Sequence, residues 1–160
     1  MPINIPDGLP AKKTLHEERI FALEEEVAEH QEIRPLRLAI LNLMPKKIQT
    51  ETQILRLISK SPIQVTCDFM RISSHESKNT AADHLVTFYS TFDDFKDKNY
   101  DGLIITGAPI EDLKYEDVDY WDEFCRIVDW SQEHVFSTMY LCWGALAGLY
   151  YLHDIPKKML

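Results

Sequence analysis

The stretch LRLAILNLMPKKIQTETQILRLISKS, residues 36–61, joins two different hydrophobic patterns. Residues 36–45 form a nearly continuous apolar run, which is typical of a strand covered on both faces of its sheet. The following residues place Ile48, Leu55 and Ile58 at near-helical spacing. A doubly covered strand followed by a helix predicts an α/β protein.

The rest of the chain continues this alternation. The pattern predicts strands within residues 63–72, 100–109 and 136–142, and helices within residues 81–95, 120–134 and 144–154. Such an order predicts an α/β fold with a doubly wound, mostly parallel sheet in a domain over residues 36–160. Residues 1–35 are Pro-rich and then strongly acidic, and we expect an N-terminal arm packed outside that domain or, equally, a solvated acidic helix.

Composition bounds the class of protein. With 160 residues, 45% hydrophobic and 27% charged, the chain has the size and make-up of one globular domain. The formal net charge of −9 argues against nonspecific binding to nucleic acid or to anionic lipid. No apolar run approaches the roughly 20 residues that span a bilayer, and residues 1–13 lack the apolar core of a secretory signal. Three cysteines without metal-like spacing favour a reducing cytoplasm.

Two of the three cysteines occupy core positions of the predicted elements. Cys67 shares one strand face with Ile63, Val65 and Phe69. Cys125 lies on the helical stripe formed by Trp121, Phe124, Cys125 and Val128. We expect both thiols to be buried and inert.

Cys142 differs from both, because it ends a predicted strand and a helix begins within two residues. In open α/β sheets ligands bind at the carboxyl ends of strands, and a helix N-terminus stabilises a thiolate. The small residues that follow, Gly144, Ala145, Ala147 and Gly148, let a tight turn approach neighbouring strands, as a nucleophile elbow requires. From the residues alone, Cys142 is either a nucleophile on such an elbow or a small apolar residue at a tight crossing.

A second motif, TGAPIE at residues 106–111, follows the strand predicted within residues 100–109. The backbone N–H groups of Gly107 and Ala108 would point into the same crevice as that of Trp143. Together they could form an oxyanion hole for a tetrahedral intermediate. The alternative is an ordinary Gly-Pro turn.

Four segments resemble the homoserine O-acyltransferases, which are homoserine O-succinyl- or O-acetyltransferases of methionine biosynthesis. They are IRPLRLAILNLMPKKIQTETQILRLISKSPIQV (residues 33–65), RISSHESKNTAADHL (71–85), YDGLIITGAPIE (100–111) and LCWGALAGLYYLHDIPKK (141–158). The resemblance implies a class I glutamine-amidotransferase-like (flavodoxin-like) three-layer α/β sandwich, and it places the family's cysteine nucleophile at Cys142. It also implies ping-pong chemistry, in which acyl-CoA acylates the cysteine and the thioester then acylates the homoserine hydroxyl. Acyl-CoA is a substrate here, and no cofactor or metal is implied.

The same resemblance implies that this chain is an N-terminal portion. The family's chains are nearly twice as long, and its catalytic His and Glu lie in the C-terminal half. Related amidotransferases carry glycine two residues before and after the cysteine, whereas this chain has Tyr140 and Gly144, which weakens a glutaminase interpretation. A homodimer is implied as well.

No histidine of the chain is an evident base for Cys142. His153 lies 11 residues further on, roughly 16 Å along a helix, and His134 precedes the strand and so lies at its opposite end. His16 and His30 fall in the arm, and His84 is expected on an outer helix. His75 alone follows the carboxyl end of a strand, where a solvated loop histidine is the commoner case.

Two further positions are candidates for substrate contact. The resemblance associates a glutamate at position 111 with acetyl-CoA and a glycine with succinyl-CoA, so Glu111 implies an acetyltransferase; the alternative is a solvated loop residue beside Asp112. Lys47 follows the first buried strand, where it could steady CoA phosphates or a substrate carboxylate, or form a solvated pair with Lys46. Competing functions are a glutamine amidotransferase and a noncatalytic fragment or association module.

Overall fold

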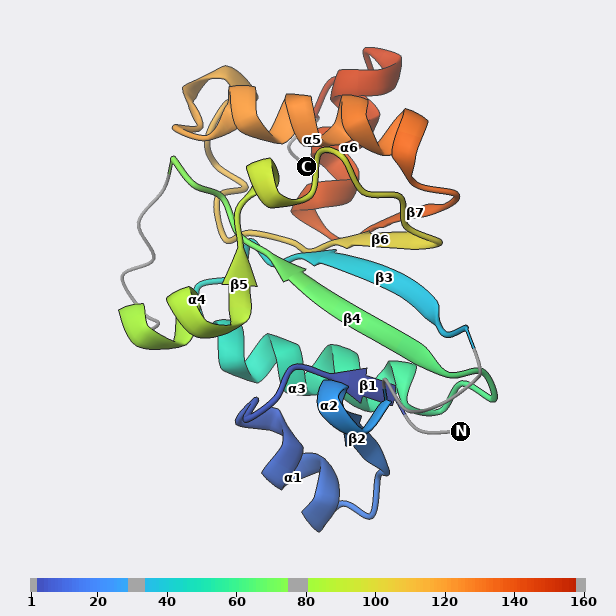
Figure 1. Cartoon of the computed structure of the whole chain (residues 1–160). Helices are drawn as coiled ribbons and strands as arrows, with labels where there is room; N and C mark the ends of the chain where they lie inside the picture. Colours follow the sequence, from blue (N-terminus) through green and yellow to red (C-terminus); the bar gives the residue numbers. More distant parts are fainter. Residues whose placement is uncertain (1–2, 29–33, 75–80, 158–160) are drawn as a thin grey trace.

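A parallel sheet with helices on both faces forms the protein (Figure 1). The computed structural model describes residues 3–28, 34–74 and 81–157. In these ranges the strands are β1 (Ile3–Ile5), β2 (Ala22–Glu24), β3 (Leu36–Leu41), β4 (Val65–Met70), β5 (Tyr89–Ser90), β6 (Gly102–Ile105) and β7 (Thr138–Tyr140). The α-helices are α1 (Ala11–Glu17), α2 (Glu25–Ala28), α3 (Lys47–Ile58), α4 (Ala82–Phe88), α5 (Trp121–His134) and α6 (Trp143–His153). Short 3-10 turns occupy Phe92–Asp94 and Tyr115–Asp117.

The strand order is β2-β1-β4-β3-β6-β7, with β5 paired to β4, and the paired strands run parallel. Helices α5 and α6 cover one face, and α1 and α3 cover the other (Figure 1). The predicted α/β fold with a mostly parallel sheet is therefore confirmed.

Successive side chains of β3 point to opposite faces of the sheet, and both faces are covered by helices. Ala39 and Leu41 belong to the core cluster that includes α5 and α6, while Ile40 belongs to the cluster that includes α1 and α3. All three side chains are fully buried. An apolar run is the pattern expected for such a strand, because neither face can be polar.

The N-terminal segment differs from the arm that the sequence predicts. Strand β1 inserts between β2 and β4, and Ile5 and Leu15 are fully buried in the core cluster on the α3 side. The acidic composition concealed this role, because β1 and β2 are only three residues long and show no periodicity. The acidic helix α2 is a single turn.

Two details of the helices also differ from expectation. On α3, Ile48 is 41% exposed, and the buried face instead includes the polar residues Lys47 and Glu51. The segment expected as one helix within residues 81–95 contains α4 followed by β5. Within the described residues, no helix is both long and apolar enough to cross a membrane.

Candidate active site

Four neighbouring strands end on one row of the sheet. Met70, Leu41, Ile105 and Tyr140 are the last residues of β4, β3, β6 and β7, and each pairs with the next across the sheet. The ladder continues one step further, because the N–H of Leu141 donates to Ile105 O at 2.9 Å. The segments that leave these strands therefore meet at one edge, where parallel sheets bind ligands.

Cys142 lies at this edge in a strained backbone conformation. Its φ of 51° and ψ of −122° fall in a region that residues with a Cβ rarely adopt. Such strain costs on the order of 1–3 kcal/mol and persists only where the surrounding structure imposes it. The residue is exposed, it directly precedes α6, and its carbonyl accepts hydrogen bonds from Ala145 N and Leu146 N. This is the geometry of a nucleophile elbow.

Two glycines let the elbow form. A Cβ on Gly107 would lie 2.9 Å from the Cβ and 3.3 Å from the Sγ of Cys142. A Cβ on Gly144 would lie 2.7 Å from the carbonyl oxygen of Thr106. The expectation that small residues allow a close crossing is therefore confirmed at Gly144, where the obstacle is backbone that cannot rotate away.

Of the backbone donors expected around Cys142, Gly107 and Trp143 lie close to each other. The Cβ position of Gly107 is 3.6 Å from the N of Trp143. Among the described residues, the structure shows no hydrogen bond from the N–H groups of Gly107, Ala108 or Trp143. The hydroxyl of Thr106 instead fixes the turn by donating to Gly107 O at 3.1 Å and accepting from Leu43 N at 2.8 Å.

A cavity of about 890 Å³ opens beside this turn. Ala108, Pro109 and Ile110 form part of one wall. The opposite wall comes from the segments after β3 and β4 and from α4, and it includes Asn42, Leu43, Met44, Pro45, Lys47, Arg71, Ile72, Ser73, Ala82, Leu85 and Val86. The volume suits a small-molecule substrate.

Lys47 is buried in this cavity wall rather than solvated. Its residue is 7% exposed, and its ammonium donates to the carbonyl oxygens of Asn42 and Met44. Burial lowers the pKa of Lys47 to about 8; the Glu51 charge opposes this change and the Arg71 charge adds to it. Its neighbour Lys46 is exposed, so the two lysines do not form a solvated pair.

Sequence reasoning missed a buried polar network behind Lys47. The Oε1 of fully buried Glu51 contacts the Nε2 of His84 at 2.9 Å and accepts the Tyr89 hydroxyl at 2.6 Å. The Tyr89 hydroxyl in turn accepts from Asn42 Nδ2 at 2.8 Å. His84 lies on a helix, α4, as expected, and its side chain is buried against Glu51. Lys47 and Glu51 are four residues apart, so on a helix their side chains share one face, and this spacing could have indicated the network from the sequence.

A second missed carboxylate fixes the segment after β4. Glu123, in the first turn of α5, is 3% exposed and accepts from the backbone N–H and hydroxyl groups of both Ser73 and Ser74. Burial raises the pKa of Glu123, but these hydrogen bonds outweigh it and leave the pKa below its usual value. A carboxylate one turn into an amphipathic helix gives no such signal in sequence.

Glu111 is exposed on the loop after the cavity wall. Its neighbours Ile110 and Leu113 line the cavity, whereas Glu111 itself does not. The ammonium of Lys157 donates to the carbonyl oxygens of Glu111 and Leu113, so the loop is held from the segment after α6.

The other cysteines are placed as predicted. Cys67 is fully buried in β4, and burial raises its pKa to about 12. Cys125 is partly buried on α5, and burial raises its pKa to about 11. Neither thiol is available as a thiolate near neutral pH.

The histidines in the described part of the chain lie away from the elbow. His134 ends α5, and its Nδ1 contacts Asn99 at 3.0 Å. His153 is the last residue of α6, and His16 lies on α1. His75 and His30 lie outside the described residues.

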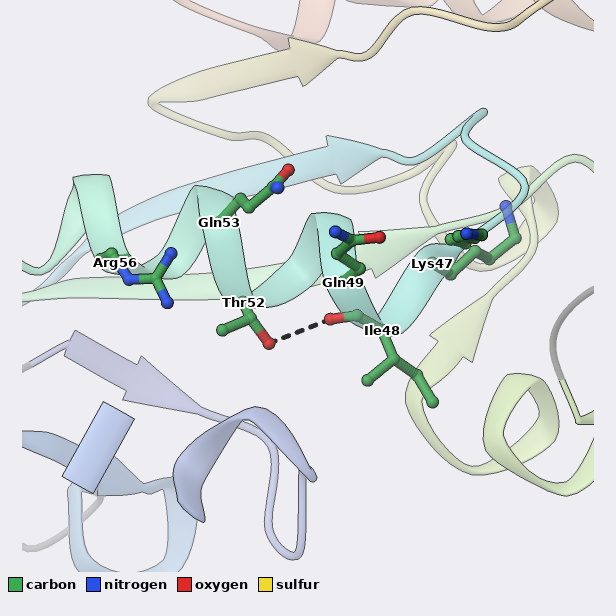
Figure 2. Close-up of a pocket in the computed structure, with 7 residues that line it drawn as sticks. Lys47, Ile48, Gln49, Thr52, Gln53 and Arg56 are labelled. Atoms are coloured by element: carbon green, nitrogen blue, oxygen red, sulfur yellow. Dashed lines mark hydrogen bonds between the residues drawn. The ribbon is translucent and has the colours of Figure 1, made fainter. Parts of the chain in front are cut away.

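A second hollow, of about 460 Å³, runs along α3 (Figure 2). It is lined by Lys46, Lys47, Ile48, Gln49, Thr52, Gln53 and Arg56, all from α3 or the residue before it. Among its lining residues, the Thr52 hydroxyl donates to Ile48 O, a side-chain bond that is common in helices (Figure 2). Cys142 and Glu111 line neither cavity. We place the candidate site at the larger one because Ala108 lines it, and the adjacent Gly107 lies against Cys142.

The chain is thus an α/β protein with an exposed cysteine on a strained strand-to-helix turn, next to backbone N–H groups that are unpaired among the described residues. The family model "Homoserine O-succinyltransferase" matches residues 2–160, and the chain belongs to this family. It is 64% identical over its full length to a homoserine O-acetyltransferase of Bifidobacterium adolescentis, of which it covers 46%. It is 58% identical to the homoserine O-acetyltransferase of Clostridium acetobutylicum and 54% identical to that of Streptococcus thermophilus, covering 53% and 51% of them. The chain thus spans about half the length of the curated relatives that it matches.

Proposed function

We propose that this chain carries the acyl-accepting part of an acyl-CoA:L-homoserine O-acyltransferase, with acetyl-CoA as donor. The elbow at Cys142 is the observation that carries the proposal, because backbone strain of this kind clusters at functional sites and the thiol is exposed. Family membership and the names of the relatives support the same reaction. Its role in methionine biosynthesis, a cytoplasmic location and a homodimer belong to the proposal.

The first half-reaction uses Cys142 and the nearby backbone. The Sγ attacks the thioester carbonyl carbon of acetyl-CoA, and the carbonyl oxygen becomes an oxyanion. The N–H groups of Gly107, Ala108 and Trp143 are unpaired among the described residues, and they are our candidates for the donors that stabilise this charge. The intermediate then breaks its bond to the coenzyme A sulfur, which leaves as a thiol with the proton of Cys142.

The second half-reaction needs a base. The hydroxyl oxygen of L-homoserine attacks the acetyl carbon on Cys142, its proton passes to the base, and the thiolate leaves. The histidines of the described residues are held elsewhere, so we assign this step to a group outside these ranges, in agreement with the family's catalytic His and Glu in its C-terminal half. Lys47 is our candidate for a substrate contact.

Intact mass after incubation with acetyl-CoA tests the proposal. One acetyl group is expected on the wild type, on Cys67→Ala and on Cys125→Ala. In the active enzyme, Cys142→Ser should lose acetylhomoserine formation by several orders of magnitude, because an alcohol does not replace an activated thiolate.

A wild type that acquires no acetyl group, or a Cys142→Ser enzyme with near-normal activity, contradicts the proposal. Ammonia release from glutamine without acetylation would instead identify a glutaminase.

A further inference from the structure

Arg71 lines the cavity, and its guanidinium forms no ion pair with any of the described residues. It directly follows β4 and lines the same cavity wall as Lys47. Its Nε is buried and makes no hydrogen bond to any of the described residues. A buried donor on a charged group is costly unless a partner arrives.

The carboxylates around Arg71 are already engaged or lie across the cavity. Asp94 is near enough for the Arg71 charge to affect it, but its Oδ2 accepts the N–H and hydroxyl of Thr91. Glu123 accepts from Ser73 and Ser74. Asp117 and Asp119 line the cavity from the loop that follows β6, so they would favour an anion on the Arg71 side.

The backbone that carries Arg71 is held in place. The N–H of Arg71 donates to Ser90 O at 3.0 Å, which ties it to β5. Two residues later, the hydrogen bonds from Ser73 and Ser74 to Glu123 tie the same segment to α5. The main chain that presents the Arg71 side chain to the cavity is therefore tied to both β5 and α5.

We propose that Arg71, with Lys47 beside it, forms a subsite for an anionic group of a substrate. The inference rests on the proposed function, in which each substrate carries such a group: the phosphates of coenzyme A and the carboxylate of L-homoserine. Both are oxyanions that match the fork of a guanidinium. Arg71 binds substrate here and takes no part in proton transfer.

The test compares Arg71→Met and Arg71→Lys with the control Arg126→Met. Arg126 is exposed on α5 and outside the cavity. Steady-state kinetics of the active enzyme should show that Arg71→Met raises the KM of one substrate about 10- to 100-fold, the loss of one charge-assisted hydrogen bond or two. The kcat should change little, Arg71→Lys should recover part of the loss, and Arg126→Met should match the wild type.

Truncated substrates identify the source of the anion. If Arg71 binds phosphate, the KM of acetyl-CoA rises and S-acetylpantetheine, which lacks the phosphates of adenosine diphosphate, is used equally by wild type and Arg71→Met. If it binds carboxylate, the KM of L-homoserine rises and L-homoserinamide shows no difference between the two proteins.

Equilibrium binding separates failure of this inference from failure of the proposed function. Calorimetry with coenzyme A and with L-homoserine measures affinity on this chain without any turnover. A weaker affinity of Arg71→Met for either ligand supports the subsite even if no acetyl group reaches Cys142. Unchanged KM values and unchanged affinities for both ligands, in a variant whose melting temperature matches the wild type, overturn it.

Discussion

At the scale of single residues, we expect the choice of acyl donor to depend on one exposed carboxylate, that of Glu111. Glu111 stands between Ile110 and Leu113, which line the cavity. Two like charges about 4 Å apart repel by roughly 1 kcal/mol in water and roughly 4 kcal/mol at an effective dielectric near 20. Because succinyl-CoA ends its acyl chain in a carboxylate and acetyl-CoA does not, we expect Glu111→Gly to lower the ratio of kcat/KM for acetyl-CoA over succinyl-CoA by about 10- to 1000-fold.

Glu111→Gln is the matched control, since it keeps the side chain and removes its charge. Most of the change in the ratio should already be present in this variant. A wild type that prefers succinyl-CoA, or a ratio that neither substitution changes, means that Glu111 does not select the donor.

The burial of Lys47 predicts that the stability of the protein depends on pH. Its pKa of about 8 in the folded chain lies below the value near 10.4 expected when unfolded. The unfolded state therefore binds more protons between these values, so this group costs stability below pH 8 and the cost disappears as the pH rises. From pH 7 to pH 9.5, Lys47→Met should lose about 2 kcal/mol of unfolding free energy relative to the wild type.

Urea unfolding of both proteins at the two pH values measures this difference. Exposed Lys46→Met serves as the control, and its difference from the wild type should not depend on pH. A Lys47→Met difference that is equally constant would mean that Lys47 is not desolvated.

At the scale of elements, the approach of α6 to β6 is set by Gly144. The Cβ of Gly144→Ala would meet the carbonyl oxygen of Thr106 at 2.7 Å, so the helix must shift away from the strand. We expect a loss of about 1–3 kcal/mol in unfolding free energy and a larger proportional loss of Cys142 acetylation. Gly148→Ala on the same helix would meet the ring of Tyr140 at 2.9 Å, and because a ring can move, acetylation should fall less.

Thermal unfolding and the rate of acetyl-adduct formation, measured on both glycine variants, check this expectation. Equal acetylation rates for Gly144→Ala and the wild type would show that the elbow tolerates a shift of α6.

The sequence predicted those elements that have a strong pattern. The apolar run of β3 and the apolar stripe of α5 are long enough to show their patterns. The glycines near Cys142 indicated the close approach of α6 to the end of β6. Strands β1 and β2, with three residues each, carry no period and depend on partners far along the chain. The sequence did not indicate that Arg71 lines the cavity or that Glu51 and Glu123 are buried, because only the folded chain shows which charged residues leave the solvent.

At the scale of the whole molecule, the proposed reaction divides between acylation and transfer. The described residues supply a nucleophile and backbone donors, while the histidines among them lie elsewhere. We therefore expect these 160 residues, tested by themselves, to turn over about 10²- to 10⁴-fold more slowly than an ordinary enzyme of this kind.

A time course of acetylhomoserine against acetyl-adduct formation distinguishes the two steps. The adduct should form well before any product appears. Product formation at ordinary enzyme rates contradicts this expectation and would make His75 the candidate base.

The row on which β4, β3, β6 and β7 end links assembly of the protein to its chemistry. Asn42, Arg71, Thr106 and Leu141, the residues that follow these strands, are separated by roughly 30 positions along the chain, yet they meet only when every parallel crossover has closed. Such nonlocal pairing forms late and slowly. We therefore expect a partly folded chain to present Cys142 before the surrounding segments are in place, and to react with a thioester only once the whole sheet has formed.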